Sequence, residues 1–123
     1  MKRREFSLTV ASAATALSLP LAAPALAQVP WVRAARLLYW GDLDTYGLSI
    51  LSMVRQALPQ AESLLMDTAT LLRFAALAGT EPTPFRGPVG YLTHSEQEAL
   101  AAVRAADTRL EQERIPLAHA VTK

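Results

Sequence analysis

The chain has 123 residues, which is enough for one small domain. It contains no cysteine, and this excludes a disulfide framework, a thiolate metal site and a cysteine nucleophile. The formal net charge is only +1, and there is no basic stripe of the kind that gives strong electrostatic binding to DNA.

The first 27 residues have the three-part layout of a secretory signal peptide. A basic start, Lys2-Arg3-Arg4, precedes an apolar stretch from Ser7 to Leu19, and Ala25-Leu26-Ala27 forms an A-x-A cleavage site. The arginine pair with Phe6 is similar to a twin-arginine (Tat) export signal, although Lys2 stands where Ser or Thr is usual. We therefore expect residues 1–27 to be a Tat-like signal peptide and residues 28–123 to form the domain.

A strand followed by a helix is predicted next. The strand covers Arg36–Trp40 and stops at Gly41, and the helix runs over Tyr46–Ala57 until Pro59 ends it. Apolar residues at helical spacing place one face of this helix in the core: Tyr46, Ile50, Leu51, Val54 and Leu58. A second strand over Glu62–Met66 completes a right-handed βαβ unit, in which the two strands are parallel.

The rest of the chain predicts mainly helices and loops. A third element over Ala69–Ala78 is capped by Asp67 or Thr68, and a proline-rich loop covers Gly79–Gly90. Thr93 and Glu96 have the spacing of a capping box, which starts a helix through about Ala106. Leu117–Val121 is expected to be a last turn or helix.

Two aspartates, Asp42 and Asp44, follow the first strand at positions i and i+2. Ligands bind at the carboxyl ends of strands in open α/β sheets, and side chains two apart on extended backbone point the same way. Two adjacent carboxylates raise each other's pKa unless a cation neutralises them, and hard oxygen ligands of this kind suit Mg²⁺. The alternative is that one of the two aspartates only caps the following helix.

The fold class is α/β, with a parallel sheet flanked by helices. Two βα units form only half of a doubly wound sheet, and a buried parallel strand needs neighbours on both sides. We therefore expect a partial sheet that is truncated at its N-terminal side and self-associates through the unpaired edge.

Three sequence blocks in this order resemble the C-terminal domain of JetD, the nuclease subunit of the Wadjet anti-plasmid defence system. They are W-G-D-L-D-T-Y-G-L-S-I-L (Trp40–Leu51), S-L-L-M-D-T-A-T-L-L (Ser63–Leu72) and R-L-E-Q-E-R-I-P (Arg109–Pro116). The resemblance covers roughly Val29–Ala120. It implies a Toprim-like domain related to the A subunit of DNA topoisomerase VI, whose G-D-x-D-x-x-G turn is similar to Gly41–Gly47.

The resemblance implies a function as well as a fold. Asp42 and Asp44 would bind Mg²⁺ during cleavage of plasmid DNA, and condensin-like Wadjet subunits would be partners. Asp67, at the carboxyl end of the second strand, is a further candidate ligand, although capping is the stronger interpretation. Glu111 and Glu113 are candidates by composition, because the glutamate that a Toprim site needs on an earlier strand is not found upstream of Val29.

Two functions therefore remain open after the sequence analysis. One is a Toprim-like, Mg²⁺-dependent DNA-cleaving domain, incomplete and catalytically compromised by the missing glutamate. The other is an exported, non-catalytic small α/β protein in which the D-x-D is only a capped turn. The signal peptide favours the periplasm, whereas a role in plasmid defence favours the cytoplasm.

Overall fold

The computed structural model describes residues 22–122. The predicted signal peptide, residues 1–27, lies for the most part outside this range and stays a prediction. Its last residues are helical over 22–26, and the side chain of Ala23 is buried in the core. No helix among the described residues has the length and apolar character needed to cross a bilayer.

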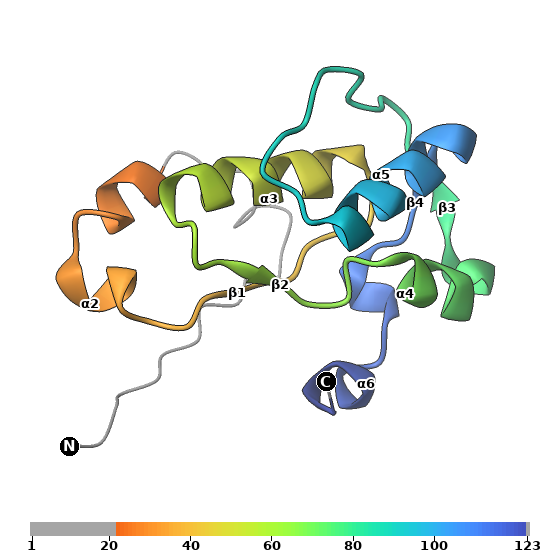
Figure 1. The fold of residues 1–123 in the computed structure, drawn as a ribbon. Coiled ribbons are helices and arrows are strands. Elements are labelled where there is room, and N and C mark those ends of the chain that lie inside the picture. Colours follow the sequence, from red (N-terminus) through yellow and green to blue (C-terminus); the bar gives the residue numbers. More distant parts are fainter. Residues whose placement is uncertain (1–21, 123) are drawn as a thin grey trace.

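The fold is mixed α/β, as predicted, with short strands and longer helices (Figure 1). The elements that follow residues 22–26 are, in chain order, α2 (Pro30–Arg33), β1 (Leu38–Tyr39), α3 (Thr45–Ala57), β2 (Glu62–Ser63), α4 (Thr68–Arg73), η1 (Ala75–Leu77), β3 (Gly79–Thr80), α5 (His94–Ala106), β4 (Thr108–Arg109), η2 (Gln112–Arg114) and α6 (Leu117–Val121).

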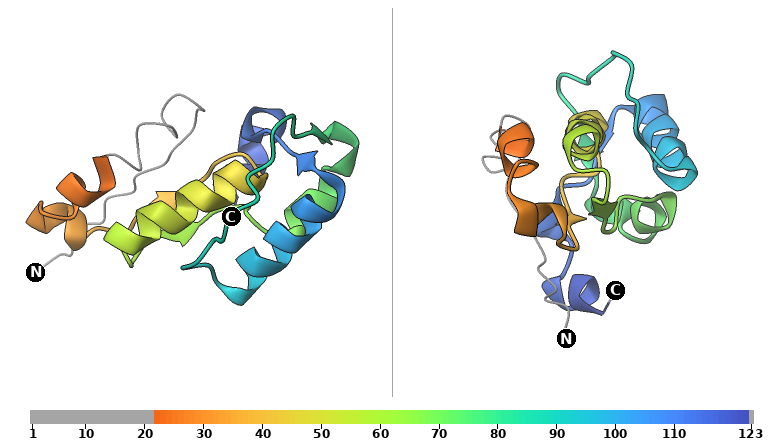
Figure 2. Two further views of the ribbon diagram at one scale, coloured as in Figure 1. Left: turned by 90° about the horizontal axis from the view of Figure 1, so that it is seen from above. Right: turned by 60° about the vertical axis from the view of Figure 1, so that its left-hand side comes forward.

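The predicted β1–α3–β2 unit is confirmed. β1 and β2 are parallel, with Leu38 opposite Glu62 and Tyr39 opposite Ser63. α3 covers one side of this strand pair, and α6 lies on the other side (Figures 1 and 2). Apolar side chains of β1 and α3 fill the space between them, and Leu48 and Leu51 are fully buried. Within the described residues β1 pairs with β2 alone, so its other edge has no strand beside it.

Several predicted boundaries were wrong. The strands over Arg36–Trp40 and Glu62–Met66 shorten to two residues each, and after β2 the chain turns away through Leu65, whose φ of 58° is left-handed. The helix over Ala69–Ala78 breaks at Phe74, so that α4 ends at Arg73 and η1 follows.

The predicted loop after η1 contains a strand that the sequence analysis missed. β3 begins this segment and pairs antiparallel with β4, with Gly79 opposite Arg109 and Thr80 opposite Thr108. This pair lies at the end of the molecule farthest from α2 (Figures 1 and 2). Two exposed residues such as Gly79 and Thr80 carry no strand pattern, and only the partner strand defines them.

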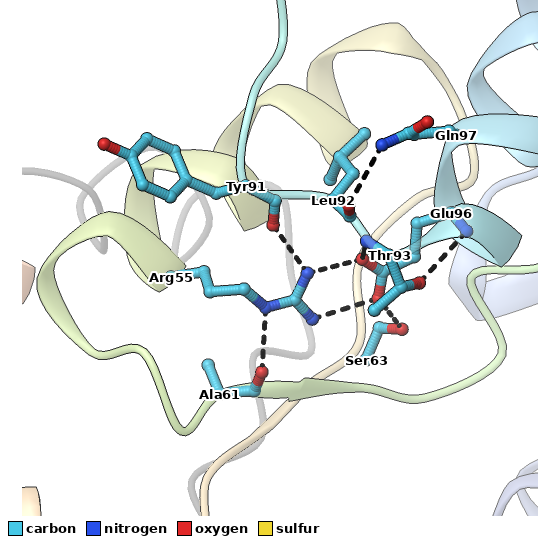
Figure 3. Close-up of polar contacts among 8 residues, drawn as sticks. All are labelled: Arg55, Ala61, Ser63, Tyr91, Leu92, Thr93, Glu96 and Gln97. Carbon is cyan, nitrogen blue, oxygen red and sulfur yellow. Dashed lines mark hydrogen bonds and ion pairs between the residues drawn. The ribbon is translucent and has the colours of Figure 1, made fainter.

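α5 begins as predicted, with a complete capping box. The Glu96 main-chain N–H donates to Thr93 Oγ1, and the Thr93 main-chain N–H donates to Glu96 Oε1. The same Glu96 carboxylate forms a buried ion pair with Arg55 of α3 and accepts a hydrogen bond from Ser63 of β2 (Figure 3). Arg55 also donates to the main-chain oxygens of Ala61 and Tyr91. One carboxylate therefore joins α3, β2 and α5.

Replacing Glu96 by Gln should reduce the free energy of unfolding by about 3 kcal/mol, because it leaves the buried Arg55 guanidinium without its charge partner. Burial alone would raise the pKa of Glu96, but the hydrogen bonds from Arg55, Ser63 and Thr93 outweigh it and lower that pKa below 4.5. The stabilisation is therefore present above the ordinary pKa and lost as the pH falls. Urea denaturation should show the difference between wild type and Glu96→Gln at pH 7, and this difference should shrink as the pH is lowered below the ordinary pKa of glutamate.

Glu98→Gln is the matched control, since Glu98 lies on the same helix but is largely exposed beside His94. It should change the free energy of unfolding by less than about 0.5 kcal/mol. An equal loss of stability in the two variants would show that Glu96 has no special role.

Candidate functional site

The turn between β1 and α3 carries both predicted aspartates. Asp44 is the N-cap of α3, and its Oδ1 accepts a 2.7 Å hydrogen bond from the Gly47 main-chain N–H. This satisfies a donor in the first helical turn, which has no partner inside the helix. The capping alternative is therefore correct for Asp44. Capping uses only Oδ1 of this carboxylate, and Oδ2 faces a second chain segment.

Gly47 is required by a close approach inside this turn. A Cβ atom built on it would lie 1.8 Å from the Asp42 carbonyl oxygen. The hydroxyl of Tyr39, buried in β1, donates a 2.8 Å hydrogen bond to the Gly47 carbonyl oxygen. The last glycine of the G-D-x-D-x-x-G pattern thus allows α3 to begin directly against the turn.

An antiparallel bridge brings the segment after β4 alongside the turn. Leu43 and Leu110 exchange main-chain hydrogen bonds of 2.9 and 3.1 Å, and both side chains are buried. Because side chains alternate along extended backbone, the neighbours of these leucines point to the opposite side. Asp42 and Asp44 therefore meet the neighbours of Leu110, namely Arg109 and Glu111.

Arg109 supplies the cation of this site. Its Nε–H donates a 2.9 Å hydrogen bond to Asp44 Oδ2, and the Arg109 side chain stays one-third exposed while that of Asp44 is 2% exposed. Asp42 is more accessible, and its Oδ1 accepts a 2.9 Å hydrogen bond from the Gln112 main-chain N–H. The two aspartates are thus held separately, one by a guanidinium and one by the start of η2.

A third carboxylate, Glu81, adjoins the turn and was missed by the sequence analysis. It is 2% exposed, and it accepts a 2.8 Å hydrogen bond from the Thr45 main-chain N–H and another from the Thr45 hydroxyl. Its place in a proline-containing loop gave no signal. Glu81 reaches the start of α3 only because β3 pairs with β4. The Glu81 N–H extends this pairing by donating to the Asp107 main-chain oxygen.

The electrostatics of the site reflect burial among like charges. Burial raises the pKa of Asp44 from 3.8 to about 6, against the hydrogen bonds from Gly47 and Arg109, and the charges of Glu81 and Asp42 raise it further. Burial also raises the pKa of Asp42, against the Gln112 hydrogen bond and with support from Glu113 and Glu111. An additional cation near these groups would lower both pKa values.

The other predicted site residues divide into two groups. Glu111 and Glu113 lie near enough to Asp42 to affect its pKa. Asp67 instead caps α4, with its Oδ1 accepting hydrogen bonds from the Thr70 main chain and hydroxyl, and it lines a separate cavity of about 460 Å³ with Arg73 and His119. Between residues 22 and 122, no group of three or more histidine, aspartate or glutamate side chains is arranged to hold a metal ion.

Oxygen donors around Asp42 nevertheless match the needs of Mg²⁺. Within the described residues Asp42 accepts a hydrogen bond through Oδ1 only, and the adjacent Gln112 has a buried side-chain oxygen, Oε1, with no hydrogen-bond partner. Mg²⁺ commonly takes one or two carboxylates and completes its octahedron with water and phosphate oxygens. These oxygens are of the chemical class that Mg²⁺ prefers, and the binding of this ion by Asp42 and Asp44 stays a prediction.

A comparison with family models identifies the family of this chain. The model described as "Wadjet protein JetD, C-terminal" matches residues 6–123, and the chain belongs to this family. The match is longer than the resemblance over Val29–Ala120, and it begins within the predicted signal peptide. A search of curated proteins found no match to the chain.

Gly47→Ala should lower the free energy of unfolding by more than about 3 kcal/mol, because the added methyl group meets main-chain atoms that cannot move away independently. Gly90→Ala is the control, since nothing lies within 4 Å of the atom that it adds. Thermal unfolding of the two variants should separate them clearly. Equal melting temperatures would mean that the turn does not pack against Gly47.

The raised pKa of Asp44 predicts a pH dependence of stability in metal-free buffer. The protonated carboxyl is favoured in the folded state, so its stabilising effect is present below pH 4 and lost as the pH rises through about 6. Wild-type stability should fall between about pH 4 and pH 6, and Asp44→Asn, which still caps the helix, should remove the part of this slope that Asp44 causes. A side-chain carboxyl ¹³C NMR titration with an Asp44 midpoint below 4.5 would contradict the prediction.

Proposed function

We propose that this member of the JetD C-terminal family is a Toprim-like domain that cleaves plasmid DNA with the help of Mg²⁺. The observation that carries the proposal is the meeting of Asp42 and Asp44, at the carboxyl end of β1, with the Arg109–Gln112 segment. The two contributing segments, Trp40–Leu51 and Arg109–Pro116, are sequence blocks that resemble JetD. Their contact gives a spatial reason for that joint resemblance.

Each residue of the site has a role in this proposal. Asp42 and Asp44 would hold the metal ion, which when bound supplies stabilisation of negative charge on a phosphodiester. The Gln112 N–H fixes the orientation of the Asp42 carboxylate, and the Gly47 N–H does the same for Asp44. Glu111 and Glu113 are the candidates for proton transfer, because Glu81 is buried and already bonded to Thr45 through both oxygens.

Membership of the family also bears on partners. It implies that the chain works with other components of the Wadjet system, and we propose condensin-like subunits and plasmid DNA as the specific partners. Among residues 22–122 no strand pairs with the edge of β1 opposite β2, and we expect a further strand, from a second copy or a partner, to add there.

The proposal is tested by incubating supercoiled plasmid with the full chain and Mg²⁺. Nicking should require the metal, stop with EDTA, and fall at least about a hundredfold in Asp42→Asn and Asp44→Asn. Asp107→Asn is the control, because Asp107 is an exposed partner of Arg86. Nicking that survives both substitutions would point to a contaminating nuclease and reject the assignment.

A non-catalytic function is favoured by one observation, namely that both oxygens of Asp44 are already used by Gly47 and Arg109. In that case the D-x-D would only build the turn. The plasmid assay with the full chain and its partners would then give no metal-dependent product, and residues 1–30 fused to a Tat reporter should direct export. Retention of that fusion in the cytoplasm would remove the exported alternative.

A further inference from the structure

Arg109 differs from the other arginines in what it neutralises. Arg36 and Arg86 pair with largely exposed carboxylates, and Arg55 pairs with a Glu96 that serves as a structural link. Arg109 alone among the described arginines makes an ion pair within the D-x-D turn, where it contacts Asp44 Oδ2. Its side chain is also one-third exposed, so it has room to move away without disturbing the core.

The contact places a cation at the position where a metal ion would bind Asp44. Oδ1 accepts a hydrogen bond from the Gly47 N–H as part of the helix cap. If this bond broke, the Gly47 N–H in the first turn of α3 would lose its hydrogen-bond partner. Oδ2 is therefore the oxygen of Asp44 that could bind a metal ion, and Arg109 Nε lies 2.9 Å from it. A second cation cannot be added beside the first without strong repulsion at this distance.

We infer that Arg109 is a built-in counter-cation of the D-x-D turn, and that a divalent metal ion must displace its guanidinium from Asp44 in order to bind. The inference rests on the proposed function, because it concerns the same metal site. Arg109 is a positioning residue in this account. Without metal its Nε–H donates to Asp44 Oδ2, and its departure frees that oxygen.

The inference predicts an unusual result, namely that removal of a site residue strengthens ligand binding. Arg109→Gln should bind Mg²⁺ about tenfold more tightly than wild type, because the metal no longer competes with a charged hydrogen bond. Arg109→Lys should lie between the two, since it keeps the charge but loses the planar guanidinium. Arg86→Gln, which removes an exposed arginine elsewhere, should bind as wild type does.

The experiment is a Mg²⁺ titration of the full chain followed by NMR. It is performed at pH 8.5, so that Asp44 stays ionised when Arg109 no longer lowers its pKa. Dissociation constants come from main-chain signals of Asp42–Gly47. In wild type, the ¹⁵Nε and ¹³Cζ shifts of Arg109, followed by ¹³C-detected NMR that does not depend on the exchanging Hε proton, report on the hydrogen bond to Asp44, and they should change in step with metal binding.

The outcomes separate this inference from the proposed function. Tighter binding by Arg109→Gln, with a change of the Arg109 ¹⁵Nε and ¹³Cζ shifts in wild type, supports both. Equal or weaker binding by Arg109→Gln, or Arg109 ¹⁵Nε and ¹³Cζ shifts unchanged by saturating Mg²⁺, overturns the inference and leaves the metal site standing. If no variant responds to Mg²⁺, the inference and the proposed metal-dependent function both fail. Should Arg109→Gln not fold, Arg109→Lys and the wild-type signal still decide the question.

Discussion

The Asp44 carboxylate is the contact on which the site depends, because its two oxygens perform two different tasks. Oδ1 accepts from the Gly47 N–H and begins α3, while Oδ2 accepts from Arg109 and fixes the β4 side of the molecule to the same turn. The carboxylate is almost fully buried, so its charge must be compensated within the protein. Burial and the neighbouring carboxylates still raise its pKa to about 6, which means that the compensation is incomplete.

Local patterns were sufficient to predict much of the fold. Helical spacing predicted α3 within one residue at its start, the capping box located the start of α5, and β1 and β2 are parallel as the βαβ pattern requires. β3 and the exact strand lengths could not be predicted, because two-residue strands are defined by their partners. The break between α4 and η1 likewise has no proline or glycine to indicate it.

The candidate site was predictable only where its residues are close in sequence. Asp42 and Asp44 stand in a recognisable turn, but whether one of them caps a helix depends on geometry that spacing does not give. Arg109 lies 65 residues from Asp44, and the Leu43–Leu110 bridge that joins them involves two ordinary leucines. Glu81 lies 36 residues from Thr45, outside all three sequence blocks. The family resemblance marked the Arg109–Pro116 block as relevant, and the bridge supplies the physical reason why it accompanies the D-x-D.

The central proposal is that the D-x-D turn binds a divalent metal ion, which must displace Arg109 from Asp44 Oδ2. A crystal structure of the full chain grown with Mn²⁺ and measured at an anomalous wavelength tests this claim most directly. We expect an anomalous peak within ligating distance of the Asp42 and Asp44 carboxylates, with the Arg109 guanidinium turned away from Oδ2. A structure without a peak at this turn, in which Arg109 Nε still donates to Asp44, would contradict the account.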